Sequence, residues 1–195
     1  MPRPPVDHFR FFAPFYDHVF GRGVQPPHLL ESLALPVSGW LLDAGGGTGR
    51  VSASVREQTG GVVIVDASRG MLQQAGQKDG LCPTLALAER LPFPDGQFER
   101  ILIVDAFHHF HHQERAAREL WRVLKPGGRL VLHEPNIARF AVKLIALGEK
   151  LLLMRSRFYG AEALRGIFAA LPDAQVAVTT DDDPFYILLI AEKTA

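Results

Sequence analysis

The sequence predicts an α/β fold in which a doubly wound, mostly parallel sheet is covered by helices on both faces. Three observations lead to this class. Seven short apolar runs alternate with longer segments of helical character. Most of these runs are apolar at successive positions, as expected of strands buried on both faces. The first run leads directly into the glycine-rich stretch LLDAGGGTGR at residues 41–50. Such a turn between a strand and a helix is typical of this class.

The expected elements follow from hydrophobic periodicity and from the positions of proline and glycine. The seven predicted strands are residues 40–44, 62–66, 85–88, 101–107, 129–135, 176–180 and 186–193. The predicted helices are residues 48–59, 68–77, 112–124, 137–154 and 160–170. The stretch KPGG at residues 125–128 ends the third of these helices, because proline and glycine interrupt helical periodicity.

Composition limits the classes of partner and the cellular compartment. The chain has 195 residues with 21 basic and 21 acidic side chains, so its formal charge is zero. A nucleic-acid partner is not expected, because such proteins need a concentrated basic surface. Cys82 is the only cysteine, which excludes an intramolecular disulfide. The N-terminus carries no continuous apolar signal segment, so a cytoplasmic protein is expected.

The first 35 residues differ from the rest, because they are rich in proline and phenylalanine. We expect residues 1–35 to form an N-terminal lid segment and residues 36–195 to form the domain itself. The aromatic residues Phe9, Phe12, Tyr16 and Phe20 follow helical spacing, which more often marks a packed face than a ligand contact. We expect some of these rings to exclude water from a site, and Tyr16 is a candidate to lie over a bound cation.

The glycine stretch predicts a ligand site at the end of the first strand. Its missing side chains let a ligand approach the backbone, and its amides point at an anion near the next helix. A dinucleotide fingerprint needs a small residue at position 50, where this chain has Arg50. The pattern that fits instead begins at Asp43 and contains Gly45, Gly46, Gly47 and Gly49.

The second predicted strand ends in Asp66, 17 positions after Gly49. A carboxylate at this strand end can accept hydrogen bonds from both hydroxyls of a ribose, which indicates an adenosine derivative. The alternative is that Asp66 caps the helix that begins in SRGML.

Four ordered motifs together carry a family resemblance: DAGGGTG, VDASRGML, AERLPFPDGQFERILIVDAFHHF and ELWRVLKPGGRLVLHEP. In this order they resemble the class I S-adenosylmethionine-dependent methyltransferases of the type 11 family, and most closely the branch of the ubiquinone and menaquinone C-methyltransferases. The resemblance covers residues 8–135 by motifs and includes FAPFYD at residues 12–17. It implies a Rossmann-like sheet of order 3-2-1-4-5-7-6 with the last strand antiparallel, and S-adenosylmethionine as cofactor.

The resemblance also implies which residues bind the cofactor. The methionine part would lie against Gly45, Gly47 and Asp43, and the ribose against Asp66. The adenine would lie between Ala67 and Met71 on one side and residues 88–91 on the other. The implied cofactor-binding set is Asp43, Gly45, Gly46, Gly47, Gly49, Asp66, Ala67, Met71, Ala88, Glu89 and Asp105. One departure is Leu87, which stands where family members have an acidic residue, so that Glu89 or a backbone carbonyl would have to replace the usual contact to the adenine amino group.

Methyl transfer mainly requires donor and acceptor to be aligned in a dry site, and a general base helps further. The candidate catalytic residues are His108, His109, His133, Glu134 and Tyr16. The histidines and Glu134 follow predicted strands, where ligands bind in open α/β sheets. Each has a structural alternative, namely a polar strand end facing water. His108 and His112 also have the spacing of a metal pair on a helix, but no carboxylate or cysteine lies at ligand spacing, so we expect no metal.

The segment 137–154 is broadly apolar but is interrupted by Arg139, Lys143, Glu149 and Lys150, so we do not expect it to span a membrane. Its wide apolar face could line a pocket for an apolar acceptor, contact a membrane surface, form a homodimer interface, or simply be buried.

These observations predict a methyltransferase that acts on a small, apolar or aromatic, quinone-like acceptor. Two alternatives stay open: a catalytically silent cofactor-binding regulatory module, and a nucleotide-dependent oxidoreductase of the same fold.

Overall fold

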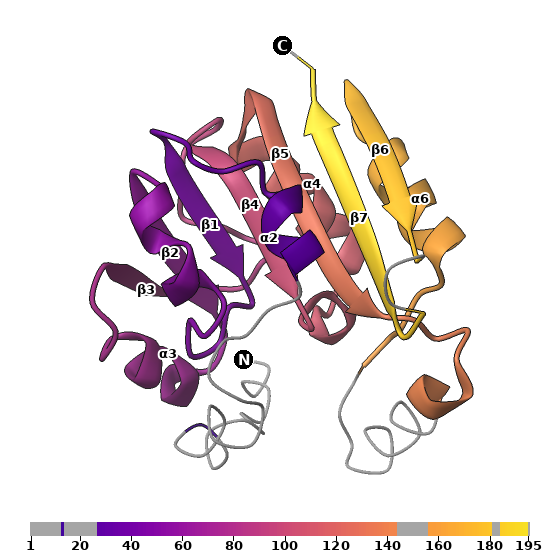
Figure 1. Cartoon of the computed structure of the whole chain (residues 1–195), viewed down its shortest axis with the longest axis horizontal. Helices are drawn as coiled ribbons and strands as arrows, with labels where there is room; N and C mark the ends of the chain where they lie inside the picture. Colours follow the sequence, from indigo (N-terminus) through magenta and orange to yellow (C-terminus); the bar gives the residue numbers. More distant parts are fainter. Residues whose placement is uncertain (1–12, 14–26, 144–155, 181–183, 195) are drawn as a thin grey trace, which may run out of the picture.

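The computed structural model describes residues 13, 27–143, 156–180 and 184–194, and its centre is one seven-stranded sheet (Figure 1). The strands are β1 (Trp40–Ala44), β2 (Gly61–Asp66), β3 (Leu81–Leu85), β4 (Phe98–Val104), β5 (Leu124–Pro135), β6 (Ala174–Thr179) and β7 (Tyr186–Lys193). Their order in the sheet is β3-β2-β1-β4-β5-β7-β6. Neighbouring strands from β3 to β5 are parallel, whereas β7 is antiparallel to both β5 and β6. The predicted class and strand order are confirmed.

The predicted and observed strands agree best where strands are buried on both faces. The bounds of β1 and β7 match the prediction residue for residue. The third strand was predicted at 85–88 but occupies Leu81–Leu85, so only Leu85 is shared. β3 is an edge strand that pairs with β2 alone, and Cys82, Pro83 and Leu85 are exposed. An edge strand tolerates proline and polar exposure, so it lacks the continuous apolar run of an inner strand.

The α-helices of the described residues are α2 (Pro27–Ser32), α3 (Arg69–Ala75), α4 (Gln113–Val123) and α6 (Ala161–Ala169). The predicted helices at 68–77, 112–124 and 160–170 correspond to the last three. The α-helix predicted at 48–59 is wrong, because this stretch forms two short 3₁₀ turns, η1 (Ser52–Ser54) and η2 (Arg56–Gln58). The hydroxyl of Ser54 donates to the backbone oxygen of Val51 (2.6 Å), and such local bonds compete with helical ones.

Two apolar cores lie on opposite faces of the sheet, because successive side chains of a strand alternate between faces. One core includes Leu42 and Ile103 and packs against α4 and α6 through residues such as Leu120 and Phe168. The other includes Leu41 and packs against α2, η1 and α3. Figure 1 shows α2 in front of the sheet and α4 behind it. The molecule is therefore a three-layer α/β/α structure.

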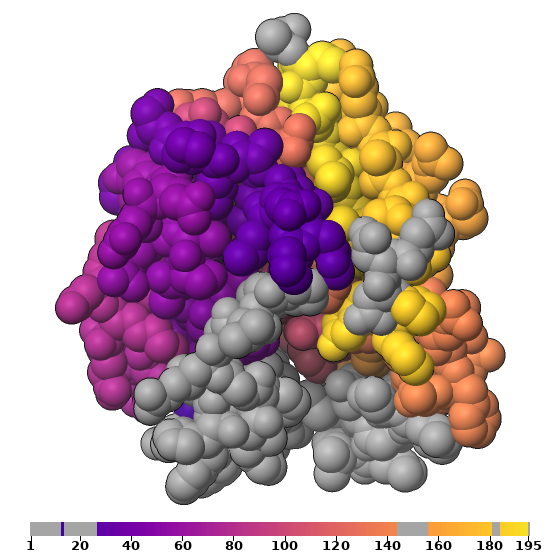
Figure 2. Space-filling view, in the orientation of Figure 1, coloured from indigo at the N-terminus to yellow at the C-terminus, as the bar shows by residue number. Residues whose placement is uncertain are grey.

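Helix α2 crosses the front face between the two edges of the sheet. Its first turn lies near the carboxyl end of β5, where the rings of His28 and His133 are 6.0 Å apart. At its other end, Arg129 donates to the carbonyl oxygen of Ser32 (2.9 Å) and Arg100 donates to that of Leu33 (2.6 Å). Cations at a helix C-terminus satisfy its last carbonyl groups. In Figure 2 this indigo segment covers the middle of the visible face.

The segment predicted as the helix 137–154 is described only as far as residue 143. There, residues 140–143 are helical, Val142 is buried and Phe140 is 75% exposed. Residues 144–154 lie outside the described part, as do the aromatic residues of the predicted N-terminal lid, Tyr16 among them. Within the described ranges, no helix has the length and apolar character needed to cross a membrane.

Candidate functional site

The glycine loop follows β1 at the carboxyl edge of the sheet, as predicted. Gly45, Gly47 and Gly49 have φ angles of 72°, 55° and 69°, which only glycine adopts readily. A Cβ atom on Gly45 would lie 2.5 Å from the Cβ of Ala106, so close packing against the residue after β4 also requires glycine. Among the described residues, a Cβ atom on Gly47 would meet Met71 Sδ at 3.9 Å and Asp66 Oδ2 at 4.0 Å and no other atom within 4 Å. In the described part of the chain, the backbone at Gly47 is therefore bordered by these two side chains without close packing.

Asp66 ends β2 and joins this loop to the next helix. Its Oδ2 accepts a hydrogen bond from the amide of Gly47 (3.0 Å), and its Oδ1 accepts one from the amide of Ser68 (2.7 Å). The N-cap of α3 is Ser68, whose hydroxyl accepts from the amide of Met71 (3.3 Å), so the alternative role of Asp66 as N-cap does not hold. The Asp66 side chain is half-buried. Because each carboxylate oxygen has more than one lone pair, Asp66 can accept further hydrogen bonds from a ligand.

Asp43 lies beneath the loop rather than in its opening. Its carboxyl group is 2% exposed, accepts a hydrogen bond from the hydroxyl of Ser52 (2.5 Å), and would be only 2.5 Å from a Cβ atom on Gly46. Burial raises the pKa of Asp43 to about 7; the Ser52 hydrogen bond opposes this, Asp66 adds to it and Arg50 opposes it. In this position Asp43 supports the backbone of the loop from inside the protein.

The side predicted to hold an adenine is formed by α3 and the loop after β3. Met71 and Ala88 are buried, whereas Ala67 and Leu87 are exposed, Leu87 by 45%. Glu89 is buried, and its Oε1 accepts a hydrogen bond from the amide of His112 at the start of α4 (3.0 Å). The Glu89 carboxylate therefore stabilises the N-terminus of a helix.

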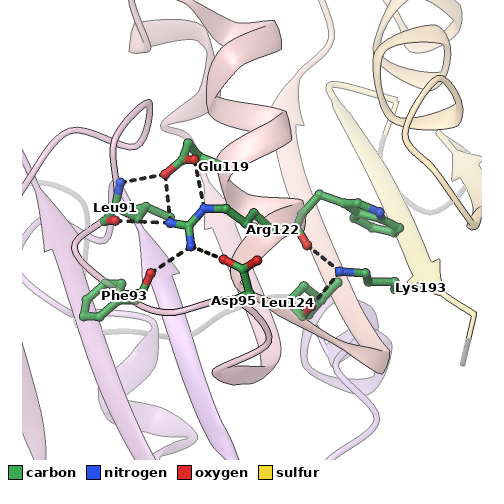
Figure 3. A network of polar contacts seen from close by, with 8 residues as sticks. Leu91, Phe93, Asp95, Glu119, Arg122, Leu124 and Lys193 are labelled. Atoms are coloured by element: carbon green, nitrogen blue, oxygen red, sulfur yellow. Dashed lines mark hydrogen bonds and ion pairs between the residues drawn. The ribbon is translucent and has the colours of Figure 1, made fainter.

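A charged network holds the loop before β4 in place (Figure 3). Arg122 of α4 donates to the carboxylate of Glu119 (3.0 Å) and to that of Asp95 (2.7 Å). It also donates to the backbone oxygens of Leu91 (3.2 Å) and Phe93 (2.9 Å). This network fixes residues 91–95 to the back of the sheet. The network was not predicted from the sequence, although Arg122 lies within one of the four quoted motifs.

Glu134, a candidate base, is a buried structural group. Its Oε1 accepts from the amides of Ala106 and Phe107 (2.8 Å each), and its Oε2 accepts from the amide of His108 (3.2 Å) and lies 2.6 Å from His108 Nδ1. The carboxylate is 4% exposed and holds the 3₁₀ turn η3 (Phe107–His109) that follows β4. Four polar contacts leave Glu134 little capacity to accept a proton from a substrate.

The two adjacent histidines lie on η3 and pack against the segment that precedes α6. The ring of His108 stacks on that of Phe158 at 4.3 Å, and His109 Nδ1 lies 3.0 Å from the hydroxyl of Ser156. Burial, together with the neighbouring His108, lowers the pKa of His109 to about 3. His109 is therefore neutral at physiological pH and a weak base.

His133 and Glu134, which are adjacent candidate catalytic residues, face opposite sides of the sheet. His133 stacks on Tyr186 of β7 with ring centroids 4.3 Å apart and packs on the α2 side, whereas Glu134 lies on the α4 side. His112 is the N-cap of α4 and His108 belongs to η3, so the two do not share a helix as a metal pair would require. Within the described ranges, no three potential ligands cluster as a metal would need.

Asp105 lies directly after β4 at the carboxyl edge of the sheet. Its φ angle is 51°, and its amide donates to the backbone oxygen of His133 (3.0 Å). Among the described residues its buried Oδ1 has no hydrogen-bond partner. Burial raises its pKa to about 6; Glu134 also raises it, and His108 and Arg50 lower it.

The residues at this edge fit the cofactor that the resemblance implies. Among the described residues, Met71 and Asp66 border the position that a Cβ atom on Gly47 would occupy, and each oxygen of the half-buried Asp66 can accept more than one hydrogen bond. An adenosine joined to an amino acid supplies hydroxyl and ammonium donors to such acceptors.

Comparisons with known proteins indicate the class of protein to which this chain is similar. The family described as "Methyltransferase domain" matches residues 42–132, which span β1 to β5. A ubiquinone/menaquinone biosynthesis C-methyltransferase of Methylococcus capsulatus is 36% identical over 104 residues, which are 48% of this chain and 42% of that protein. Its counterpart in Pseudomonas putida is 32% identical over 158 residues, 76% of this chain and 56% of that protein. The chain thus spans about half the length of the relatives that it matches.

A solved structure shows the same fold along nearly the whole chain. It is a SAM-dependent methyltransferase of Thermotoga maritima, described as a possible histamine N-methyltransferase, with a TM-score of 0.73 and 21% identity. The match covers 95% of this chain and 98% of that one. This likeness establishes the fold alone. The match over residues 42–132 shows that the chain contains a methyltransferase domain, as the four motifs predict.

Proposed function

We propose that this chain transfers a methyl group from S-adenosylmethionine to a small, apolar or aromatic acceptor of the quinone type. The observation that carries the proposal is the hydrogen bond from the amide of Gly47 to the carboxylate of Asp66. This bond places the glycine loop beside a half-buried acceptor group at the carboxyl edge of the sheet. Open α/β sheets bind ligands at this edge.

The cofactor, when bound, supplies a methyl group already activated on a sulfonium. The residues of the chain then have to bind, orient and exclude water. In the proposed arrangement Asp66 accepts the ribose hydroxyls and the amides of the glycine loop face the methionine part. Met71 and Ala88 contact the adenine through apolar surface. Asp43 and Ser52 hold the loop in shape from below. Orientation of the two reactants alone can contribute roughly 7–11 kcal/mol to lowering the barrier.

The nature of the acceptor is supported by the relatives, which carry the name of quinone C-methyltransferases.

Calorimetric titration with S-adenosylhomocysteine tests the cofactor site directly. We expect binding to the wild-type protein, and a loss of roughly 1–3 kcal/mol in binding free energy for Asp66→Ala, because a charge-assisted hydrogen bond is removed. Asp79→Ala is the matched control, since Asp79 is an exposed aspartate outside the site. The proposal fails if the wild-type protein shows no heat of binding at millimolar ligand, or if it binds NAD more tightly.

A second measurement tests turnover. The protein is incubated with methyl-labelled S-adenosylmethionine and a panel of quinols, phenols and small amines, and transfer of the label is counted. Label on a quinol or phenol supports the proposal. Cofactor binding without transfer to any member of the panel favours a catalytically silent regulatory module instead.

A further inference from the structure

We propose that Asp105 is the proton acceptor of the methyl-transfer step. The inference rests on the proposed function and adds a role for one carboxylate to it. Resemblance to the family implied only that Asp105 contacts the cofactor. The position of Asp105, its backbone conformation and the contacts of the other candidate bases indicate that it also takes part in proton transfer.

The position of Asp105 in the fold supports this role. Asp105 follows β4, the strand beside β1, and its amide bonds to the backbone of β5 through His133 (3.0 Å). The next residue, Ala106, packs so closely on the glycine loop that a Cβ atom on Gly45 would be 2.5 Å from its own Cβ. Asp105 therefore lies where the cofactor loop meets the β4 and β5 ends. An acceptor would have to enter at this junction, because Asp66 and the adenine side occupy the other half of the edge.

The backbone conformation of Asp105 is uncommon. Among the described residues, three other than glycine have a positive φ angle: Ala34, Asp105 and Asp173. The left-handed region costs most residues other than glycine roughly 1–2 kcal/mol, and aspartate is one of the few that adopt it more readily. Asp173 is exposed in a surface turn, whereas Asp105 lies at the edge where the ligand binds. Strained residues that persist at such an edge commonly serve function, because the surrounding structure holds a side chain where it is needed.

Two of the other candidate bases are either held by hydrogen bonds or weakly basic. Both oxygens of Glu134 already accept hydrogen bonds, and His109 has a pKa lowered to about 3. The Oδ1 atom of Asp105 is buried and has no hydrogen-bond partner in the described part of the chain. Charged groups face Asp105 from three elements: Glu134 from β5, His108 from η3 and Arg50 from the glycine loop. Burial, reinforced by Glu134, holds its pKa near 6, so the carboxylate is ionised at pH 7 and still basic enough to take a proton.

The chemistry requires such a group. When an acceptor is methylated, its nucleophilic atom forms a bond to the methyl carbon with its own electron pair, and the carbon–sulfur bond breaks with its pair left on sulfur. The positive charge of the sulfonium is lost, and the acceptor releases one proton, from its hydroxyl group or from the methylated carbon. We assign that proton to Asp105 Oδ1, which becomes a neutral carboxyl group and later returns the proton to water.

Asp105→Asn tests the role, because it keeps the shape of the side chain and removes its basicity. With a prenylated 1,4-naphthoquinol as probe, we expect kcat to fall by about 10²- to 10⁴-fold, while the dissociation constant of S-adenosylhomocysteine changes less than threefold. The kcat of the wild-type protein should rise with pH through about 6 and then level off, and this rise should be absent in Asp105→Asn. Asp173→Asn is the matched control, since it changes an aspartate of similar φ angle far from the edge, and its kinetics should equal the wild type.

Two outcomes overturn the proposal. If Asp105→Asn weakens S-adenosylhomocysteine tenfold or more and leaves kcat unchanged, Asp105 anchors the cofactor. If the variant keeps both its rate and the pH profile, Asp105 has no role in the proton transfer. An NMR titration of the Asp105 carboxyl carbon decides independently of any acceptor: a midpoint near 6 in the complex with S-adenosylhomocysteine supports the proposal, and a midpoint below 4.5 contradicts it. Failure of the wild-type protein to bind S-adenosylhomocysteine would instead refute the proposed function itself.

Discussion

Asp66 and Glu134 are both carboxylates at the carboxyl edge of the sheet, and both accept hydrogen bonds from backbone amides. They differ in burial and in the number of their hydrogen bonds. Asp66 accepts hydrogen bonds from the amides of Gly47 and Ser68 and is only half-buried, so part of this residue is exposed at the edge of the sheet. Glu134 is 4% exposed and is in contact with three amides and one imidazole. The β1–β2 half of the edge is thus open to a ligand, whereas this part of the β4–β5 half is closed by its own hydrogen bonds. Whether a carboxylate at a strand end can bind a ligand depends on its exposure and on the hydrogen bonds it already accepts.

Replacing Glu134 by alanine should cause the largest loss of stability. The replacement removes the hydrogen-bond acceptor of three buried amides and the partner of the His108 ring. Breaking such a buried pair typically costs about 3–5 kcal/mol. Urea unfolding at pH 7 measures the effect. Glu57→Ala is the control, because that side chain is 86% exposed, and we expect it to change the unfolding free energy by less than about 0.5 kcal/mol. A loss no larger than that of the control would show that the turn η3 does not depend on Glu134.

The buried Asp43 extends the comparison to pH. Its pKa of about 7 in the folded protein lies above the ordinary value of 3.8, so the fold favours the protonated form. The contribution of Asp43 to stability is therefore greatest below pH 4, falls as the pH rises from about 4 to 7, and is constant above that; the difference amounts to at most about 4 kcal/mol. Asp43→Asn should remove this decline from the curve of unfolding free energy against pH. Parallel curves for the two proteins would contradict the prediction.

The smallest effect concerns the open half of the edge. Gly47→Ala should cost roughly 1–2 kcal/mol of stability, because alanine is strained at a φ angle of 55°. Gly127→Ala provides the same strain without a ligand site, since Gly127 has a φ angle of 74° and no atom within 4 Å of an added Cβ. We expect the two variants to lose similar stability in thermal unfolding, whereas only Gly47→Ala weakens binding of S-adenosylhomocysteine in calorimetry. Equal affinities would place the ligand elsewhere.

The inner strands could be predicted from the sequence because burial on two faces leaves a continuous apolar run. The 3₁₀ turns at Ser52–Ser54 and Arg56–Gln58 could not, because Ser52 bonds to Asp43, nine positions earlier, and local periodicity does not report such a bond. The edge strand Leu81–Leu85 escaped prediction because it is largely exposed.

The same distinction holds for the site. The glycine loop and Asp66 are recognisable because their spacing reflects a local turn between one strand and the next. The role of Glu134 cannot be recognised from the sequence, because its partners lie 26 to 28 positions away and become neighbours only when β4 and β5 pair. For Asp105, position after a strand was visible in the sequence, whereas its positive φ angle and its orphaned oxygen required the structure.

The position of β7 has a consequence for how the chain acquires its structure during synthesis. β7 is the last strand along the chain, but it lies inside the sheet between β5 and β6. The β1–β4 half can assemble from pairings between early segments, whereas β5 and β6 stay unpaired on their shared side until residues 186–193 have left the ribosome. Pairings between distant segments form slowly and leave strand edges exposed meanwhile. The nascent chain therefore presents its most aggregation-prone surface late, after the cofactor half has already formed.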